Sequence, residues 1–206
     1  MIYVPNKLVF YHVPKTGGSW FIFNMVKNVN EETFFGSDFH WTRTMFVDKD
    51  HWLDIRGLPS LAFVRNPITW YLSFWKHKNR VGWTTNNDVS WFADISRDCK
   101  HADFEEFLKL VLERHPGFLT RLYKGYLGER FNDLRYVVKQ ENLLDGCCKV
   151  LRECGIQYDE KSFRVFPRNN VAPKEAKVPY SPELKSLIAS AESEIMIKFN
   201  YKEVGK

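Results

Sequence analysis

Residues 8–20 read LVFYHVPKTGGSW, and this stretch sets the fold class of the chain. The apolar run of residues 8–13 is stopped by Pro14 and predicts a short buried strand. A loop with two glycines follows at residues 15–19, and residues 20–29 can run as a helix. A strand, a glycine-containing loop and a helix in this order are typical of a phosphate-binding βα unit.

Later segments repeat the alternation of strand and helix. Residues 61–64 predict a second buried strand, and Pro67 begins a helix that is expected to reach about Lys78. Residues 136–138 predict a third strand, and a helix is expected over residues 143–154. We therefore predict an α/β protein with a P-loop-like three-layer fold, in which helices flank a central parallel sheet.

Two further helices are marked by capping residues. Asp103 and Glu106 form a capping-box pattern, and this helix is expected to end at residues 115–117. Ser181 precedes a proline and begins a last helix that is expected to extend to Ile195. The segments expected to be irregular or loop-like are residues 30–59, 79–102 and 165–180.

Composition limits the possible functions. The 206 residues suit one domain over residues 1–206, and no segment reads as a linker. The 30 Lys and Arg residues are scattered among 25 Asp and Glu residues, so no nucleic-acid partner is expected. No apolar run could span a membrane and residues 1–7 lack a signal-peptide core, which predicts a cytoplasmic protein without a membrane partner. A truncated lumenal domain is the alternative.

Metal binding is not expected. The four cysteines are Cys99, Cys147, Cys148 and Cys154, and none belongs to a CxxC pair. Their spacing fits neither a zinc site nor a disulfide framework, so they are interpreted as buried or inert thiols.

The glycine-containing loop has the chemistry of an anion site. Gly17 and Gly18 allow the backbone to approach a phosphate, and the following helix presents its N-terminal N–H groups. Thr16 and Ser19 add hydroxyl donors, and Lys15 adds a positive charge. The order of residues differs from a Walker A motif, where the lysine follows the glycines. The alternative is a surface turn without a ligand.

Arg65 is a second candidate for anion binding. It stands directly after the strand of residues 61–64, at the end where α/β proteins bind ligands. Its planar guanidinium suits a phosphate. A structural arginine paired with a carboxylate is the alternative.

Both stretches resemble the sulfotransferases that use 3′-phosphoadenosine 5′-phosphosulfate (PAPS). HVPKTGGS at residues 12–19 is similar to their 5′-phosphosulfate-binding loop, in the form found in carbohydrate sulfotransferases. Trp20 resembles the tryptophan of the same loop in the cytosolic branch, which implies that it also contacts the nucleotide. FVRNPITWYLS at residues 63–73 resembles the 3′-phosphate-binding segment, which implies that Arg65 and Ser73 hold the 3′-phosphate. The family often has Asp-Arg where this chain has Thr-Trp within that segment.

Two later segments are similar to the family over shorter stretches. VVKQENL at residues 137–143 resembles a strand and turn with a structural role. FPRNN at residues 166–170 resembles the loop that closes over the nucleotide, which implies a phosphate contact for Arg168. An arginine that faces solvent is the alternative.

The resemblance also implies a reaction. Lys15 would stabilise the leaving oxygen, and no metal is needed. The base would be His40, although a structural histidine is the alternative. His12 is interpreted as structural, and the reserve candidates for the base are His51, Asp38 and Glu31.

The acceptor is expected to be a small molecule or a carbohydrate with a hydroxyl group. The segment of residues 79–102 is the expected specificity element, and Trp41, Trp83 and Trp91 could stack on sugars. The competing functions are a nucleotide-dependent kinase and a non-catalytic nucleotide- or glycan-binding module. Acceptor identity and oligomeric state are not specified by the sequence.

Overall fold

The structure is a computed structural model that describes most of the chain in two compact units. Unit 1 contains Met1–Arg65 and Tyr123–Asn170, and unit 2 contains Asn66–Leu122 and Val171–Lys206. The division into one domain over residues 1–206 stays a prediction. The described residues are 1–35, 45–48, 51–53, 57–83, 90–167 and 180–201, without the side chains of 35, 45–48, 51–53, 90–91 and 129.

Unit 1 is built on a five-stranded sheet with the order β3-β1-β2-β6-β7. β2 (Leu8–Tyr11), β6 (Ser60–Val64) and β7 (Tyr136–Lys139) run parallel to one another. β1 (Ile2–Val4) runs antiparallel to β2 and to β3 (Phe34–Phe35). The predicted α/β fold with a central sheet flanked by helices is therefore confirmed, and the sheet differs from the expected parallel one only in its antiparallel strands β1 and β3. The sheet is mixed because the short connection between β1 and β2 allows only an antiparallel turn.

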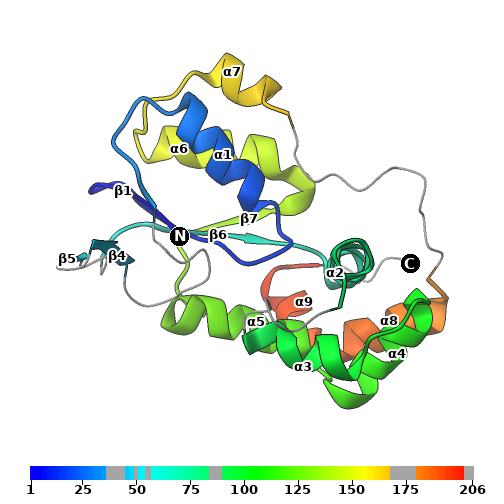
Figure 1. Cartoon of the computed structure of the whole chain (residues 1–206). Coiled ribbons are helices and arrows are strands. Elements are labelled where there is room, and N and C mark those ends of the chain that lie inside the picture. The colour runs from blue at the N-terminus through cyan, green and yellow to red at the C-terminus, as the bar shows by residue number, and fades with distance from the viewer. Residues whose placement is uncertain (36–44, 49–50, 54–56, 84–89, 168–179, 202–206) are drawn as a thin grey trace. The chain divides into compact units, whose positions relative to one another are not determined.

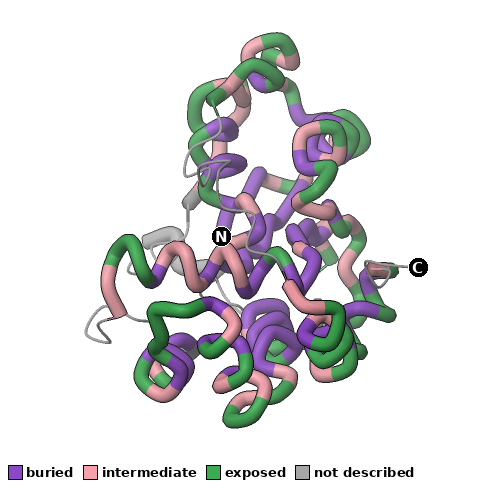
Figure 2. Tube along the Cα trace, turned by 90° about the vertical axis from the view of Figure 1, so that its right-hand side faces the viewer, coloured by how far each residue is buried: buried purple, intermediate pink, exposed green. Residues whose placement is uncertain are grey.

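One face of this sheet is covered by α1 (Gly18–Asn28), α6 (Leu143–Glu153) and α7 (Glu160–Val165), as Figure 1 shows. Alternate side chains of the strands point toward these helices because side-chain direction has a period of two. In Figure 2 the buried positions follow the strands and the inner faces of the helices. The strand residues of this core are Ile2, Val4, Leu8, Phe10, Leu61, Phe63 and Val138.

The prediction that residues 30–59 are irregular was wrong for three short strands. Besides β3, they are β4 (Met45–Asp48) and β5 (His51–Leu53), which pair with each other as an antiparallel hairpin. In the sequence, two short apolar runs, Met-Phe-Val at residues 45–47 and Trp-Leu at residues 52–53, are separated by the polar residues 48–51, which is a readable hairpin signal. Unit 1 also contains the 3₁₀ turns η1 (Gly128–Phe131) and η2 (Gln140–Asn142).

Unit 2 consists of helices in its described part. The predicted loop over residues 79–102 was wrong, because its first residues complete one helix and residues 90–98 form another. Phe92, Ile95 and Cys99 are buried at helical spacing and give the second helix its apolar face. No helix in the described ranges is both long and apolar enough to cross a membrane. The helices are α2 (Pro67–Val81), α3 (Ser90–Asp98), α4 (Phe104–Arg114), α5 (Phe118–Leu127, which ends in unit 1), α8 (Pro182–Ala191) and α9 (Ser193–Lys198).

The predicted capping residues are confirmed. Asp103 accepts a hydrogen bond from the backbone N–H of Glu106 at 3.0 Å. Ser181 accepts one from the N–H of Leu184 at 3.1 Å. These bonds satisfy N–H groups that have no partner within the first turn of a helix.

The last predicted helix is divided at Glu192, which separates α8 from α9. The Glu192 carboxylate is fully buried and accepts hydrogen bonds from the N–H groups of Leu119 and Thr120, at 3.0 and 2.8 Å. The hydroxyls of Thr120 and Tyr71 also donate to it. The carboxylate thus caps the N-terminus of α5, and the negative charge lies at the positive end of that helix.

Candidate anion-binding site

The candidate site in unit 1 lies where parallel strands end. The register pairs Tyr11 of β2 with Ala62 of β6, and Val64 of β6 with Lys139 of β7. The carboxyl ends of the three strands therefore meet at one edge of the sheet. This is the edge at which α/β proteins bind ligands.

The segment between β2 and α1, residues 14–19, is here called the glycine loop. Lys15 and Gly17 have left-handed backbone conformations, with φ of 66° and 99°. Gly17 is the N-cap of α1, and no side chain caps this helix in the described structure. The N–H groups of Gly18, Ser19 and Trp20 lie in the first turn, where a helix offers them no carbonyl partner. This helix end can therefore accept an anion.

Close contacts with neighbouring side chains explain why positions 17 and 18 of the loop are both glycine. A Cβ atom on Gly17 would lie 2.7 Å from Cδ2 of Leu143 and would need a strained backbone. A Cβ atom on Gly18 would overlap the imidazole ring of His12. His12 is buried and stacks on Phe10, which agrees with its predicted structural role. The glycine loop is thus held against both β2 and the start of α6.

The polar side chains of the glycine loop differ in position. Thr16 is fully buried, and its hydroxyl donates to the carbonyl of Val13 at 2.7 Å. This bond closes the loop, so the Thr16 hydroxyl proton points into the protein. Ser19 is exposed and Lys15 is half-buried. These two side chains remain the predicted ligand groups with access to solvent.

Arg65 links the two sequence motifs. Its guanidinium Nη1 donates to the backbone carbonyl of Lys15 at 3.1 Å, and its own N–H donates to the Tyr123 hydroxyl at 3.0 Å. The structure therefore brings together the predicted residues Lys15 and Arg65. The sequence analysis missed Tyr123, which has no local signal because it lies 58 positions away.

Ser73 belongs to unit 2. It lies on α2 and is half-buried. Asn66 is the N-cap of the helix that carries it, and the Asn66 side chain accepts from the N–H of Ile68 at 2.9 Å. The cap therefore fixes the start of α2 at Pro67, two residues after Arg65 in the chain.

Trp20 is part of the protein core. Its ring packs edge-on against Phe163 of α7 with ring centroids 5.5 Å apart, and its Nε1 donates to the carbonyl of Phe166 at 3.3 Å. Asn24, one turn further along α1, donates to the carbonyl of Phe163 at 2.9 Å. These bonds hold the end of α7 against α1. A direct contact between Trp20 and a nucleotide stays a prediction.

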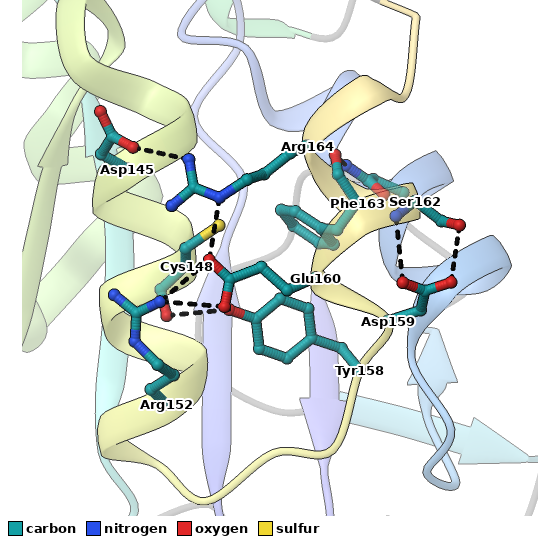
Figure 3. A network of polar contacts seen from close by, with 10 residues as sticks. Asp145, Cys148, Arg152, Tyr158, Asp159, Glu160, Ser162, Phe163 and Arg164 are labelled. Atoms are coloured by element: carbon teal, nitrogen blue, oxygen red, sulfur yellow. Dashed lines mark hydrogen bonds and ion pairs between the residues drawn. The ribbon is translucent and has the colours of Figure 1, made fainter.

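A group of ion pairs fastens α7 to α6, as Figure 3 shows. Arg164 lies between Asp145 of α6 and Glu160 of α7, at 2.9 and 2.8 Å. Arg152 also contacts Glu160, at 3.1 Å. Hydrogen bonds from both arginines hold the pKa of Glu160 below its ordinary value. α7 is thus fixed to both helices that start beside the glycine loop.

Several predicted residues fall outside the described part of the chain. Arg168 lies just beyond it, two residues after Phe166, and His40 also lies outside it, as do Asp38 and Trp41. The side chains of His51 and Trp91 are not described either. Their roles stay predictions.

Glu31 has a structural partner. Its carboxylate lies 2.7 Å from Nζ of Lys7 and accepts from the N–H of Gln157 at 2.6 Å. Partial burial raises its pKa, but these bonds outweigh that effect and hold the pKa below its ordinary value. A carboxylate with a lowered pKa is a weak proton acceptor, so Glu31 is a poor choice of base.

Trp83 and the cysteines have packing roles. The Trp83 ring lies 5.6 Å from Phe107, and its Nε1 donates to Asn79 at 3.4 Å. The cysteines are free, and burial raises the pKa of Cys99 to about 11. In the described ranges no three side chains of His, Cys, Asp or Glu gather as a metal site.

The fold defines an α/β protein in which a helix end without a side-chain cap lies at the carboxyl edge of the sheet. The model of the family described as "Sulfotransferase family" matches residues 2–195. The chain belongs to this PAPS-dependent family, and it is a sulfotransferase. The predicted family and enzyme class are therefore confirmed. No curated protein and no solved structure matches the chain.

Proposed function

We propose that this sulfotransferase binds PAPS at the glycine loop and transfers its sulfuryl group to a hydroxyl, with a carbohydrate as acceptor. The supporting observation is the bond from Arg65 to the carbonyl of Lys15, which places a guanidinium beside the helix end that has no side-chain cap. Two anion-binding features therefore lie together within unit 1.

The residues present fit a nucleotide with two anionic ends. The N–H groups of Gly18, Ser19 and Trp20 would hold the 5′-phosphosulfate, because the missing Cβ atoms allow close approach. Arg65 and Ser73 would hold the 3′-phosphate. A guanidinium carries five N–H donors, so it can bond to the loop and to an anion together. When bound, PAPS supplies the sulfuryl group and a phosphate leaving group.

The proposed catalytic roles follow from the positive charge of Lys15 and from the ability of His40 to accept a proton. The Lys15 ammonium stabilises negative charge that develops on the leaving oxygen. His40 takes the proton of the acceptor hydroxyl, because an imidazole with an ordinary pKa near 6.5 can do so at neutral pH. Arg168 adds a contact to the nucleotide. The assignments of His40 and Arg168 rest on their place in the sequence.

The carbohydrate acceptor and the cellular location are more specific proposals than the transfer of a sulfuryl group. The carbohydrate is proposed from the form of residues 12–19, and Trp83 is a candidate for stacking on a sugar. No metal and no nucleic-acid or membrane partner is proposed, and a cytoplasmic location stays a prediction.

Calorimetry and label transfer test this proposal together. Desulfated PAPS (PAP) should bind the full chain without Mg²⁺, and ATP with Mg²⁺ should bind far more weakly. ³⁵S from labelled PAPS should then appear in an oligosaccharide from an acceptor panel, and Lys15→Ala should abolish this transfer. Preferred binding of ATP with Mg²⁺ would instead indicate a kinase. PAP binding without transfer to any acceptor would contradict the proposed acceptor class.

A further inference from the structure

A groove of about 510 Å³ lies beside the edge strand β7 in unit 1. β7 forms one wall, and the face of α6 that carries Gly146 and Lys149 forms the other. A Cβ on Gly146 would lie 2.5 Å from a Val138 methyl group, so the glycine allows α6 to lie close to the strand. The groove is therefore built by both elements.

The open edge of β7 can accept another strand. β7 is the last strand of the five-stranded sheet, and within the described ranges no strand pairs with its outer edge. In any β-strand, every second residue directs its N–H and C=O groups toward the same edge. Val137, in the middle of the strand, is 42% exposed. An edge that no described strand covers, together with an exposed apolar side chain, is a template for strand addition.

The charged side chains that line the groove indicate what kind of segment it binds. Arg135 and Lys139 stand at positions two residues before and after Val137, and Lys149 lines the opposite wall. Among the described residues that line the groove, the only carboxylate is that of Glu153, which lies 3.8 Å from Nζ of Lys149. The groove therefore has an excess of positive charge.

We propose that this groove binds an extended acidic segment of a partner polypeptide, which adds to the sheet as a strand beside β7. The segment carries acidic, apolar and acidic residues at every second position, opposite Arg135, Val137 and Lys139. Cross-strand pairs of opposite charge stabilise such an arrangement, and the apolar residue covers Val137. The backbone edge favours a peptide over an acidic polysaccharide, which has no amide ladder.

A designed peptide tests the proposal on the full chain. The probe is a capped peptide with Glu, Val and Glu at alternate positions and Thr between and around them. In ¹⁵N NMR titrations, the amide signals of residues 136–139 should shift with saturation. A peptide with Lys in place of both Glu residues should bind at least about tenfold more weakly.

Backbone methylation tests strand addition itself. One probe carries N-methyl groups at the Glu and Val positions, and a second carries them at the Thr positions. Only one of these two sets of N–H groups can face β7, so one probe should lose about tenfold in affinity and the other should bind like the parent. Equal binding of both probes would show that no strand is added.

Charge reversal on the protein completes the test. Arg135→Glu combined with Lys139→Glu should weaken peptide binding by about tenfold, because both proposed pairs are replaced by repulsion. Lys161→Glu on the exposed part of α7 is the matched control and should leave binding unchanged. Loss of binding in the control as well, no peptide binding to the unmodified chain, or equal competition by a polyuronate chain would overturn the proposal.

Discussion

The guanidinium of Arg65 donates a hydrogen bond to the backbone carbonyl of Lys15, with 3.1 Å between Nη1 and the oxygen. Two residues that are 50 positions apart are thereby joined at the carboxyl edge of the sheet. Arg65 holds the glycine loop in its left-handed conformation and brings positive charge to the same place. It therefore links the geometry of the loop to the proposed binding of a nucleotide.

Arg65→Ala should weaken PAP binding by about 10- to 100-fold, because a charge-assisted hydrogen bond is lost. Arg65→Lys should recover only part of this loss, since an ammonium cannot reproduce the planar fork. Isothermal calorimetry measures both affinities. Arg97→Ala on exposed α3 is the matched control and should bind PAP normally. Unchanged PAP affinity in both Arg65 variants would contradict the proposed role.

The glycine loop and the segment around Arg65 were predictable because each is a pattern of neighbouring residues. The glycine loop, the caps at Asp103 and Ser181, and the strands at residues 8–13 and 61–64 are written in consecutive residues. The bond between Arg65 and Tyr123 was not predictable, because a pair so far apart in sequence leaves no periodicity or spacing to read.

The wrong loop prediction for residues 79–102 has a different cause. The segment contains polar residues and asparagines, which lower its average hydrophobicity. The buried stripe of Phe92, Ile95 and Cys99 was nevertheless present at helical spacing. The loop prediction followed the polar composition of the segment, although the periodicity of its apolar residues indicates a helix.

The fit of Gly18 against His12 predicts that Gly18→Ala destabilises the protein. The added methyl group would overlap the imidazole, and overpacking of this kind costs about 1–3 kcal/mol. Urea unfolding followed by circular dichroism measures the change. The exposed neighbour provides the control, since Ser19→Ala should change stability by less than about 0.5 kcal/mol.

A double variant of Gly18 and His12 tests whether the clash with the imidazole ring causes this loss of stability. If the clash with the ring is responsible, His12→Ala should provide space, and the double variant should be less destabilised than the sum of the single variants. Strict additivity would show that the cost of the alanine has another origin.

Glu160 predicts an acid-sensitive attachment of α7. Its pKa is lowered in the folded protein by hydrogen bonds from Arg164 and Arg152, so the folded state favours the carboxylate. This contribution to stability is present above the unfolded pKa, for which 4.5 is the reference, and is lost as pH falls through the lower folded pKa. Unfolding by urea at pH 7 and at pH 3 to 5 should show the loss. Glu160→Gln should lessen it, whereas Glu113→Gln at an exposed position of α4 should not.

The buried carboxylate of Glu192 gives the last prediction. It accepts bonds from two backbone N–H groups and two hydroxyls, and Glu192→Gln would turn an NH₂ group toward some of these donors. A buried donor that loses its acceptor costs about 1–3 kcal/mol, which should lower Tm by several degrees in thermal unfolding.

Burial and the nearby Glu192 charge raise the pKa of Tyr71 well above its ordinary value, so the tyrosine remains a donor at neutral pH. Tyr71→Phe should therefore also lower Tm, and combining the two substitutions should cost less than their sum because they share one bond. Glu113→Gln on the exposed side of α4 is the control, and a Tm loss as large as that of Glu192→Gln would contradict the capping role.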